Sequence, residues 1–112
     1  MKRVLVSILS IAFILSMSAC SKEADPQFRI VNQRPEKANV QIQTSGGNTI
    51  NINDVQEGQT TAYQSVSEGT IVVTAVIQNE SVSPTVTFFA AKDTRYTVTI
   101  LTGDPPSLRA NH

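Results

Sequence analysis

The chain has one cysteine and one histidine, the side chains most often used as a nucleophile and as a base, and they lie toward its two ends. Cys20 is the only cysteine, and His112, the last residue, is the only histidine. A serine or threonine nucleophile needs a base held beside it, and a terminal histidine is poorly placed for that role. We therefore expect a protein that is not an enzyme, and no residue pattern indicates a nucleotide or another small-molecule cofactor.

Candidate metal ligands are also sparse. Calcium requires several oxygen atoms that converge on one loop. Asn51, Asn53 and Asp54 lie close in sequence, as do Glu23 and Asp25, but neither group has the spacing of a known calcium loop. We expect both groups to be solvated loop residues and predict no metal site.

The surroundings of Cys20 suggest a different chemistry for its thiol. Lys2 and Arg3 precede an uncharged, mostly apolar run that ends at Met17, which is the pattern of a secretory signal peptide. This run of roughly 14 residues is shorter than the ~20 that a helix needs to cross the hydrocarbon core. An ordinary signal peptide cut after Ala19 is the alternative, but it would leave a single thiol without a partner at the new N-terminus.

The sequence Met-Ser-Ala-Cys that ends at Cys20 resembles the lipobox of bacterial lipoprotein precursors. The resemblance implies that residues 1–19 are removed and that Cys20 is acylated as the first residue of the mature protein. Ser21, in place of an aspartate, then implies sorting to the outer membrane. Each buried methylene contributes ~0.8 kcal/mol, so several acyl chains hold a protein firmly. We therefore expect a protein of the cell envelope that is held at the membrane by a lipid anchor.

The mature chain has no basic excess. The whole sequence carries nine basic and nine acidic residues, and Lys2 and Arg3 leave with the signal, so the mature net charge is about −2. On net charge, nucleic acid and anionic lipid surfaces are unexpected partners. The partners we expect are the membrane, through the anchor, and an envelope protein.

The mature chain is rich in Thr, Val, Ile, Gln, Asn and Ser, a composition that favours strands. Alternating patterns bounded by turn residues predict seven strands, at 27–32, 38–44, 49–52, 59–66, 70–78, 82–89 and 94–101. Seven short strands without a helical period predict an all-β fold, a single immunoglobulin-like antiparallel β-sandwich, with a small β-barrel as the alternative. The expected organisation is a signal peptide (1–19), a lipidated tether (20–26), the sandwich (27–106) and a polar C-terminal tail (107–112).

The order of several residues resembles a bacterial envelope family, the domain of unknown function numbered four-three-nine-seven. That family has an Arg-hydrophobic-x-Asn opening, a proline, an alternating strand, a tyrosine, a turn ending in Gly, and a final Tyr-Thr-Val strand. The residues that match are Arg29-Ile30-Val31-Asn32, Pro35, Val40-Gln41-Ile42, Tyr63, Glu68-Gly69-Thr70 and Tyr96-Thr97-Val98. The family often has an aspartate where Gln41 stands, so no carboxylate role is carried over. The resemblance implies a β-sandwich in the envelope and supplies no activity.

An apolar surface is one candidate site. Phe88 and Phe89 are adjacent, so in a strand they point to opposite faces, and one should face outward. Val72 and Val76 lie opposite the predicted core face of their own strand. Exposed together, these residues would form a surface for a partner or for self-association. The alternative is that loops, the tether or the tail cover them.

Three arginines offer a second candidate. Arg29, Arg34 and Arg95 would form an anion site only if the fold brings them together, and solvated single arginines are the default expectation.

The predicted function is an envelope lipoprotein acting as a non-enzymatic binding or accessory module. One alternative is an architectural subunit that self-associates or packs on an envelope complex. Another is a carbohydrate-binding module, which is disfavoured because the chain has no Trp and only two tyrosines, Tyr63 and Tyr96.

Overall fold

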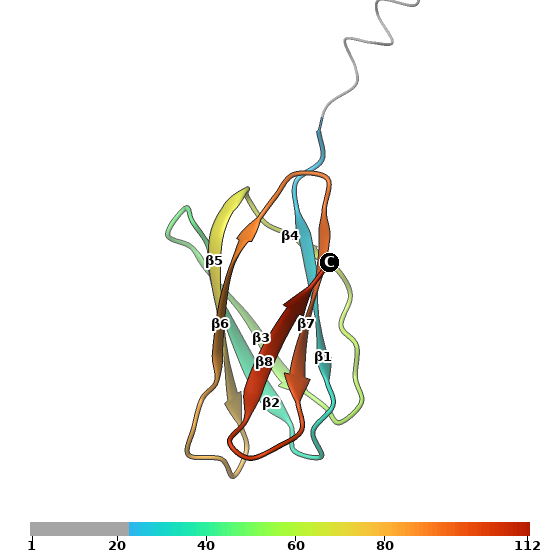
Figure 1. Ribbon diagram of the computed structural model, residues 1–112, viewed down its shortest axis with the longest axis vertical. Coiled ribbons are helices and arrows are strands. Elements are labelled where there is room, and N and C mark those ends of the chain that lie inside the picture. The colour runs from blue at the N-terminus through green and yellow to red at the C-terminus, as the bar shows by residue number, and fades with distance from the viewer. Residues whose placement is uncertain (1–22) are drawn as a thin grey trace, which may run out of the picture.

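The computed structural model describes residues 23–112 and folds them into eight strands without a helix (Figure 1). The predicted signal peptide, Cys20 and Ser21 lie outside the described residues. Within residues 23–112, no helix is long and apolar enough to cross a membrane. The strands are β1 (Gln27–Asn32), β2 (Ala38–Gln43), β3 (Thr49–Val55), β4 (Gln64–Ser65), β5 (Gly69–Ile77), β6 (Thr85–Ala90), β7 (Arg95–Leu101) and β8 (Ser107–Asn111).

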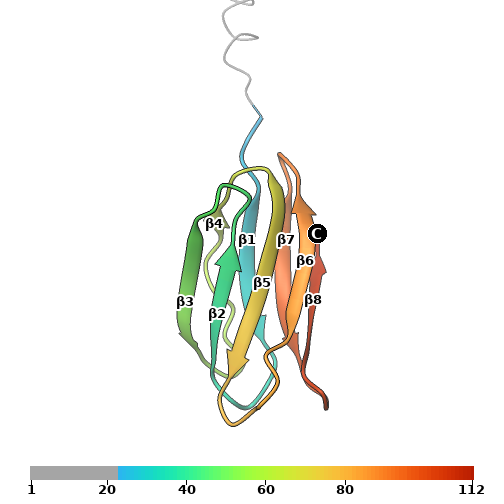
Figure 2. The same ribbon diagram turned by 90° about the vertical axis from the view of Figure 1, so that its left-hand side faces the viewer.

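The strands form two four-stranded sheets that pack face to face (Figures 1 and 2). Sheet A has the order β4-β1-β7-β8, and sheet B has the order β3-β2-β5-β6. All paired strands are antiparallel except β1 and β7, which run parallel with Gln27 opposite Arg95. The predicted all-β sandwich is confirmed, and the sheets do not close into a barrel.

The core lies between the two sheets and is built by strict alternation. In β5 the odd-numbered residues from Ile71 to Ile77 are buried, while Thr70 and Val76 are exposed, as expected where alternate side chains point to opposite faces. Val73 in sheet B and Phe28 in sheet A both have no exposed surface. The buried apolar residues are Phe28, Ile30, Ala38, Val40, Ile42, Val55, Val66, Ile71, Val73, Ala75, Ile77, Ala90, Tyr96, Val98 and Ile100.

The fourth predicted strand, 59–66, is much shorter than expected, because only Gln64–Ser65 is regular. The residues before it still follow β1 through single hydrogen bonds. Asn32 N donates to Gln59 O at 3.0 Å and Thr61 N donates to Ile30 O at 2.9 Å. The Thr61 hydroxyl also accepts from Ile30 N at 2.9 Å. This side-chain bond takes a donor that a regular ladder would use, so the segment stays an irregular edge.

The predicted C-terminal tail is wrong, because residues 107–111 form strand β8 on the edge of sheet A. β8 pairs antiparallel with β7, with Leu108 opposite Ile100 and Ala110 opposite Val98. Both Leu108 and Ala110 pack against the core. The sandwich therefore extends to Asn111 and does not end at residue 106. Two apolar residues at alternate positions were too short a signal to set against the polar composition of this segment.

The second half of the predicted tether, 20–26, belongs to the folded domain. Ala24 N donates to Asp93 Oδ1 at 2.7 Å, and Asp93 N donates to Ala24 O at 2.8 Å. Asp25 pairs with Lys92 at 3.0 Å, and the buried Pro26 accepts from Val66 N at 2.9 Å. These bonds leave only residues 21–23 between Cys20 and the domain, a reach of about 10 Å when fully extended.

Candidate anion-binding face

Charged side chains are rare in the strands, and the few present are segregated between the sheets. Sheet A contains three cations, Arg29 in β1, Arg95 in β7 and Arg109 in β8, and no carboxylate. Sheet B contains one charged residue, Asp54 near the end of β3, and none in β2, β5 or β6. The other charged residues of the described chain lie in the connections. The three arginines therefore form a cationic set without a counter-charge in their own sheet.

The strand register places the three arginines in successive rows on the outer face of sheet A. Arg95 begins β7, Arg29 lies opposite Thr97, and Arg109 lies opposite Thr99. The alternate residues of β1 and β7 between them are buried in the core, so the arginines point away from it. With ~3.3 Å per residue along a strand and ~4.8 Å between strands, the Arg95 and Arg109 backbones lie about 14 Å apart. We call this surface the arginine face.

Tyr63 joins two of these arginines. The Arg29 guanidinium carbon lies 4.8 Å from the centre of the Tyr63 ring, and the Arg95 guanidinium carbon lies 5.1 Å from the same centre. A cation held against an aromatic ring gains about 0.5–1 kcal/mol at an exposed site. The ring is half-buried on the outer face of sheet A and lies outside every regular strand, although Tyr63 falls within the predicted strand 59–66. It holds guanidinium groups from two strands close together.

Each arginine of the face is oriented by one hydrogen bond from its Nε to a neutral acceptor. Arg29 Nε donates to the Thr97 hydroxyl at 3.1 Å, and Arg95 Nε donates to Gln27 Oε1 at 3.0 Å. With the Asn111 amide oxygen turned toward it, Arg109 Nε donates to that oxygen at 3.0 Å. The terminal nitrogens of Arg29 and Arg95 make no hydrogen bond with any other residue in 23–112. Five N–H donors in a fixed fork suit oxyanions, so most of this donor capacity faces outward.

No carboxylate lies within 4.0 Å of Arg29, Arg95 or Arg109 among the described residues, whereas Arg34 has two such partners. Arg34 is buried in the connection between β1 and β2, and its Nη2 contacts Glu36 at 3.1 Å and Glu80 at 2.9 Å. The default expectation of solvated single arginines is therefore wrong for Arg34, and an anion site made by all three arginines is excluded, since Arg34 lies apart from the other two. Arg29 and Arg95 do converge, at Tyr63.

Arg34 instead closes the end of the sandwich far from the tether. Its Nη1 donates to the carbonyl oxygens of Leu101 at 3.1 Å and Gly103 at 2.9 Å. Its backbone N–H donates to Oδ1 of the fully buried Asn32 at 2.9 Å. Asn32 Nδ2 donates in turn to Val55 O at 3.0 Å. This network links both sheets, so Arg34 stabilises the fold and is unavailable to an outside anion.

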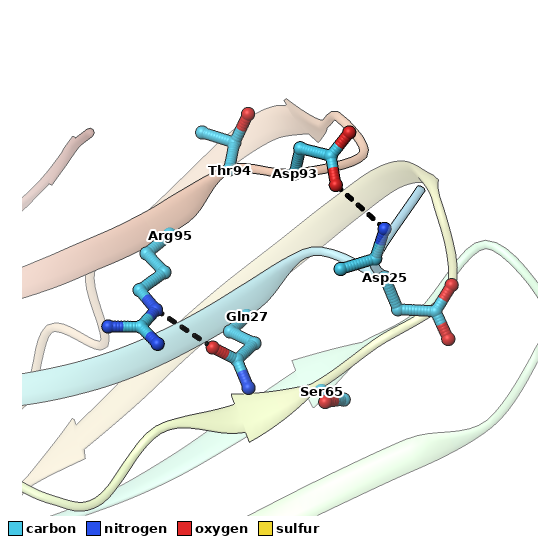
Figure 3. A pocket seen from close by; sticks show the side chains of 7 residues that line it. Asp25, Gln27, Ser65, Asp93, Thr94 and Arg95 are labelled. Carbon is cyan, nitrogen blue, oxygen red and sulfur yellow. Dashed lines mark hydrogen bonds between the residues drawn. The ribbon is translucent and has the colours of Figure 1, made fainter. Parts of the chain in front are cut away.

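A cavity of about 370 Å³ opens beside the arginine face, at the end of the domain where the chain enters (Figure 3). Figure 3 shows Arg95 and Gln27 along one side and Asp93 and Asp25 along the other. The hydrogen bond from Lys92 to Asp25, reinforced by the charge of Asp25, raises the pKa of Lys92 above its usual 10.5. The residues that line the cavity are Ala24, Asp25, Gln27, Ser65, Asp93, Thr94 and Arg95.

The residues of the predicted apolar surface do not all face outward in the structure. Phe89 faces outward and is 59% exposed, which confirms that one of the two adjacent rings points away from the core. Phe88 is the inward ring, half-buried against the core with its centre 4.9 Å from that of Tyr96. The prediction that Phe88 forms part of a partner surface is therefore wrong.

Phe89, Val72 and Val76 share the outer face of sheet B but do not form one patch. Phe89 lies opposite Thr70, while Val76 lies six residues farther along β5, which is about 20 Å in a strand. Val72 lies between them and is only half-exposed. Val76 instead lines a separate hollow of about 210 Å³ with Lys37, Asn39 and Gln78.

Neither metal ligands nor a catalytic set gathers in the part of the chain that the structure describes. Residues 23–112 contain no group of three or more His, Cys, Asp or Glu side chains arranged to hold a metal ion. His112 lies with its ring centre 5.7 Å from that of Tyr96. No hydroxyl group accepts or donates a hydrogen bond with that histidine among the described residues.

Sequence reasoning missed two members of the arginine face, Tyr63 and Arg109. Arg109 fell in the segment taken for a tail, although its neighbours Leu108 and Ala110 carry the alternation of a strand. Tyr63 lies within the predicted strand 59–66, and no local pattern there indicates a contact with two arginines. Only the parallel pairing of β1 with β7, which joins residues 68 positions apart, places Arg29 and Arg95 around it.

Comparisons with known proteins identify the fold and nothing further. No protein-family model and no curated protein matches the chain. Among solved structures, it is similar to the NMR structure of a protein from Eubacterium rectale, with a TM-score of 0.56 and 19% sequence identity. The similarity covers 80% of this chain and 88% of that one. At this identity the likeness shows a shared β-sandwich fold alone.

Proposed function

We propose that this protein is a lipid-anchored envelope lipoprotein whose β-sandwich is a non-enzymatic accessory module that docks on anionic lipid headgroups. Cys20 carries the anchor, and the outer membrane is its proposed location. The observation that carries the docking proposal is the arginine face, with three cations and no carboxylate in the same sheet. The resemblance to the envelope family of unknown function stays a prediction and names no ligand.

The position of the chain entry supports the membrane as the partner of this face. Residues 24–26 are bonded to the domain beside Arg95, and only three residues separate them from Cys20. A tether with a reach of about 10 Å holds that end of the domain near the lipid surface. Arg29 and Arg109 follow Arg95 along the same face, so the domain can lie with sheet A toward the headgroups.

Net charge alone argued against an anionic surface, but it averages over charges that the fold separates. The mature chain is slightly acidic, yet its carboxylates lie in connections, apart from Asp54 at the end of β3 in the opposite sheet. Surface charges more than ~8–10 Å apart are largely screened from one another at physiological salt. A headgroup layer in contact with sheet A would therefore meet the arginines first.

The expected energy suits an anchored protein rather than a free one. A basic residue near an anionic membrane contributes about 1 kcal/mol, so three arginines contribute about 3 kcal/mol. That is too little to keep a soluble domain on a membrane. It is enough to favour one orientation of a domain that a lipid anchor already holds there.

One observation favours the architectural alternative. The outer face of sheet B has no charge on β2, β5 or β6 and exposes Phe89, so a second copy or an envelope protein would meet little electrostatic resistance there. A mature Cys20→Ala chain that stays monomeric at high concentration would count against self-association. The carbohydrate-binding alternative gains no support, because Tyr96 is buried and Tyr63 is occupied by two arginines.

The anchor is tested by fractionating cells that express the Cys20→Ala variant. We expect the wild-type chain in the membrane fraction and the variant in the soluble fraction, because the remaining arginines bind too weakly. Replacing Ser18 by Ala leaves the cysteine intact and serves as the matched control. A Cys20→Ala protein that still pellets with membranes at high salt would contradict the lipid anchor.

A further inference from the structure

The cavity beside the arginine face has two ends of opposite charge. It is formed where three segments meet, the chain entry, the start of β7 and the short strand β4. Arg95 and Gln27 stand along one side and Asp93 and Asp25 along the other (Figure 3). Its volume, about 370 Å³, lies within the range of small-molecule sites, which starts at about 300 Å³.

The cationic end is supplied by Arg95. Its Nε is held by Gln27 Oε1 at 3.0 Å, so the orientation of the guanidinium group is fixed while its terminal nitrogens bond no other described residue. Arg29 stands one row away and shares the Tyr63 ring with Arg95. Ser65 adds an exposed hydroxyl to the lining. The Arg95 guanidinium group and this hydroxyl, with the charge of Arg29 outside the lining, suit a phosphate group, which carries up to −2 charge and three oxygen acceptors.

The anionic end is supplied by Asp93. Asp25 is already paired with Lys92 at 3.0 Å, so its charge is largely balanced. Asp93 forms no ion pair with a residue in 23–112. Its Oδ1 accepts from the backbone N–H of Ala24 at 2.7 Å, which fixes the carboxylate and leaves Oδ2 for another donor. An ammonium group is a suitable donor for that oxygen.

We infer that this cavity binds a small zwitterion, with its phosphate at Arg95 and its primary ammonium at Asp93. The chemistry is that of phosphoethanolamine, which has two sources in an envelope, a phospholipid headgroup and a soluble phosphoamine. The inference goes beyond the proposed docking function, which concerns anionic headgroups, because phosphoethanolamine also carries an ammonium group. The cavity is complete in the domain and needs no membrane to be tested.

The test is a titration of the mature, ¹⁵N-labelled Cys20→Ala chain with O-phosphoethanolamine, followed by NMR. We expect saturable shifts of the backbone amides that line the cavity, in residues 24, 25, 27, 65 and 93–95. Inorganic phosphate should bind more weakly, and ethanolamine alone should bind more weakly still, because each supplies one of the two ends. Shifts that avoid the cavity would overturn the inference.

Two substitutions separate the ends of the site. Asp93→Asn keeps the acceptor for Ala24 and suits the left-handed backbone of this residue (φ 60°), and it removes only the charge. It should weaken the binding of O-phosphoethanolamine about two- to fivefold and leave the affinity for inorganic phosphate unchanged or slightly higher. Arg95→Gln should weaken both ligands by a similar factor. An Asp93→Asn variant with unchanged affinity for O-phosphoethanolamine would overturn the ammonium end.

The matched control is Arg109→Gln, which removes the same charge from the same face about 14 Å from Arg95. It should leave the affinity for O-phosphoethanolamine unchanged. A loss of affinity equal to that of Arg95→Gln would show that the ligand responds to the overall positive charge of the face and does not bind at a defined site.

Glycerophosphoethanolamine, a phosphodiester without acyl chains, distinguishes the two sources. If glycerophosphoethanolamine binds as tightly as O-phosphoethanolamine, the ligand of the cavity is a lipid headgroup. If only the monoester O-phosphoethanolamine binds, the ligand is a soluble phosphoamine. Because these ligands are soluble and the docking proposal concerns anionic lipids without an ammonium group, either can fail while the other holds.

Discussion

The two outer faces of the sandwich differ in charge although the same rules build both sheets. The arginine face carries Arg29 and Arg95 against the Tyr63 ring, and Arg109 farther along the same face. The outer face of sheet B carries threonine, glutamine, asparagine and valine, with Phe89 as its one strongly exposed ring. Both inner faces are apolar and alternate in the same way. Folding therefore does not require the difference, which makes the arginine face a candidate for function.

The comparison also separates two uses of arginine. Arg34 is buried, touches two carboxylates and donates to two backbone carbonyls. Arg29 and Arg95 use only Nε within the domain, on neutral acceptors. An arginine whose terminal nitrogens are occupied within the domain maintains structure, whereas one whose terminal nitrogens remain free can bind an anion.

The largest loss of stability is expected from a charge placed on the inner side of sheet B. Val73→Asp buries a carboxylate without a partner, at a cost of about 3–5 kcal/mol, against a total stability of about 5–13 kcal/mol for a domain of this size. The neighbouring Val72→Asp adds the same charge to the half-exposed outer face and should cost about 1 kcal/mol. Chemical denaturation of both variants measures the difference, and equal losses would mean that the faces of β5 are assigned wrongly.

A smaller effect is expected from removing arginines of the two kinds. Arg34→Ala leaves Glu36 and Glu80 without their cation and two carbonyl groups without a donor, so the domain should lose about 3 kcal/mol. Arg109→Ala should change stability by no more than about 0.5 kcal/mol. Thermal unfolding followed by circular dichroism decides between them. An equal loss for both variants would remove the distinction between structural and available arginines.

Much of the fold could be predicted from local periodicity. The first strand has the predicted bounds, and β2, β5 and β7 begin and end within one residue of prediction. The alternation of apolar and polar residues indicates which positions share a face, and burial of the apolar face stabilises each strand. It fails where few apolar residues carry the pattern, as in β8, or where a side-chain hydrogen bond interrupts the ladder, as at Thr61.

The candidate site was less predictable, because it depends on which strands become neighbours. Arg29 and Arg95 meet only because β1 and β7 pair in parallel, and no local pattern encodes that pairing. Sequence reasoning established that one of Phe88 and Phe89 faces outward, but the choice between them depends on the register with β5. Arg34 lies two residues from Glu36 in the sequence, but only the fold brings Glu80 to it.

The most direct test is the orientation of the anchored domain on a membrane. Cys20 is the only cysteine, so the mature chain can be coupled through it to a maleimide lipid in bilayer discs that contain a paramagnetic headgroup. NMR line broadening then reports which amides approach the surface. On phosphatidylglycerol discs, we predict stronger broadening for outward positions of sheet A, such as Thr97 and Arg109, than for Thr74 and Thr85 of sheet B. The contrast should vanish on phosphatidylcholine and in the triple variant with Gln at all three arginines. Equal broadening of the two faces on phosphatidylglycerol would contradict the docking function of the arginine face.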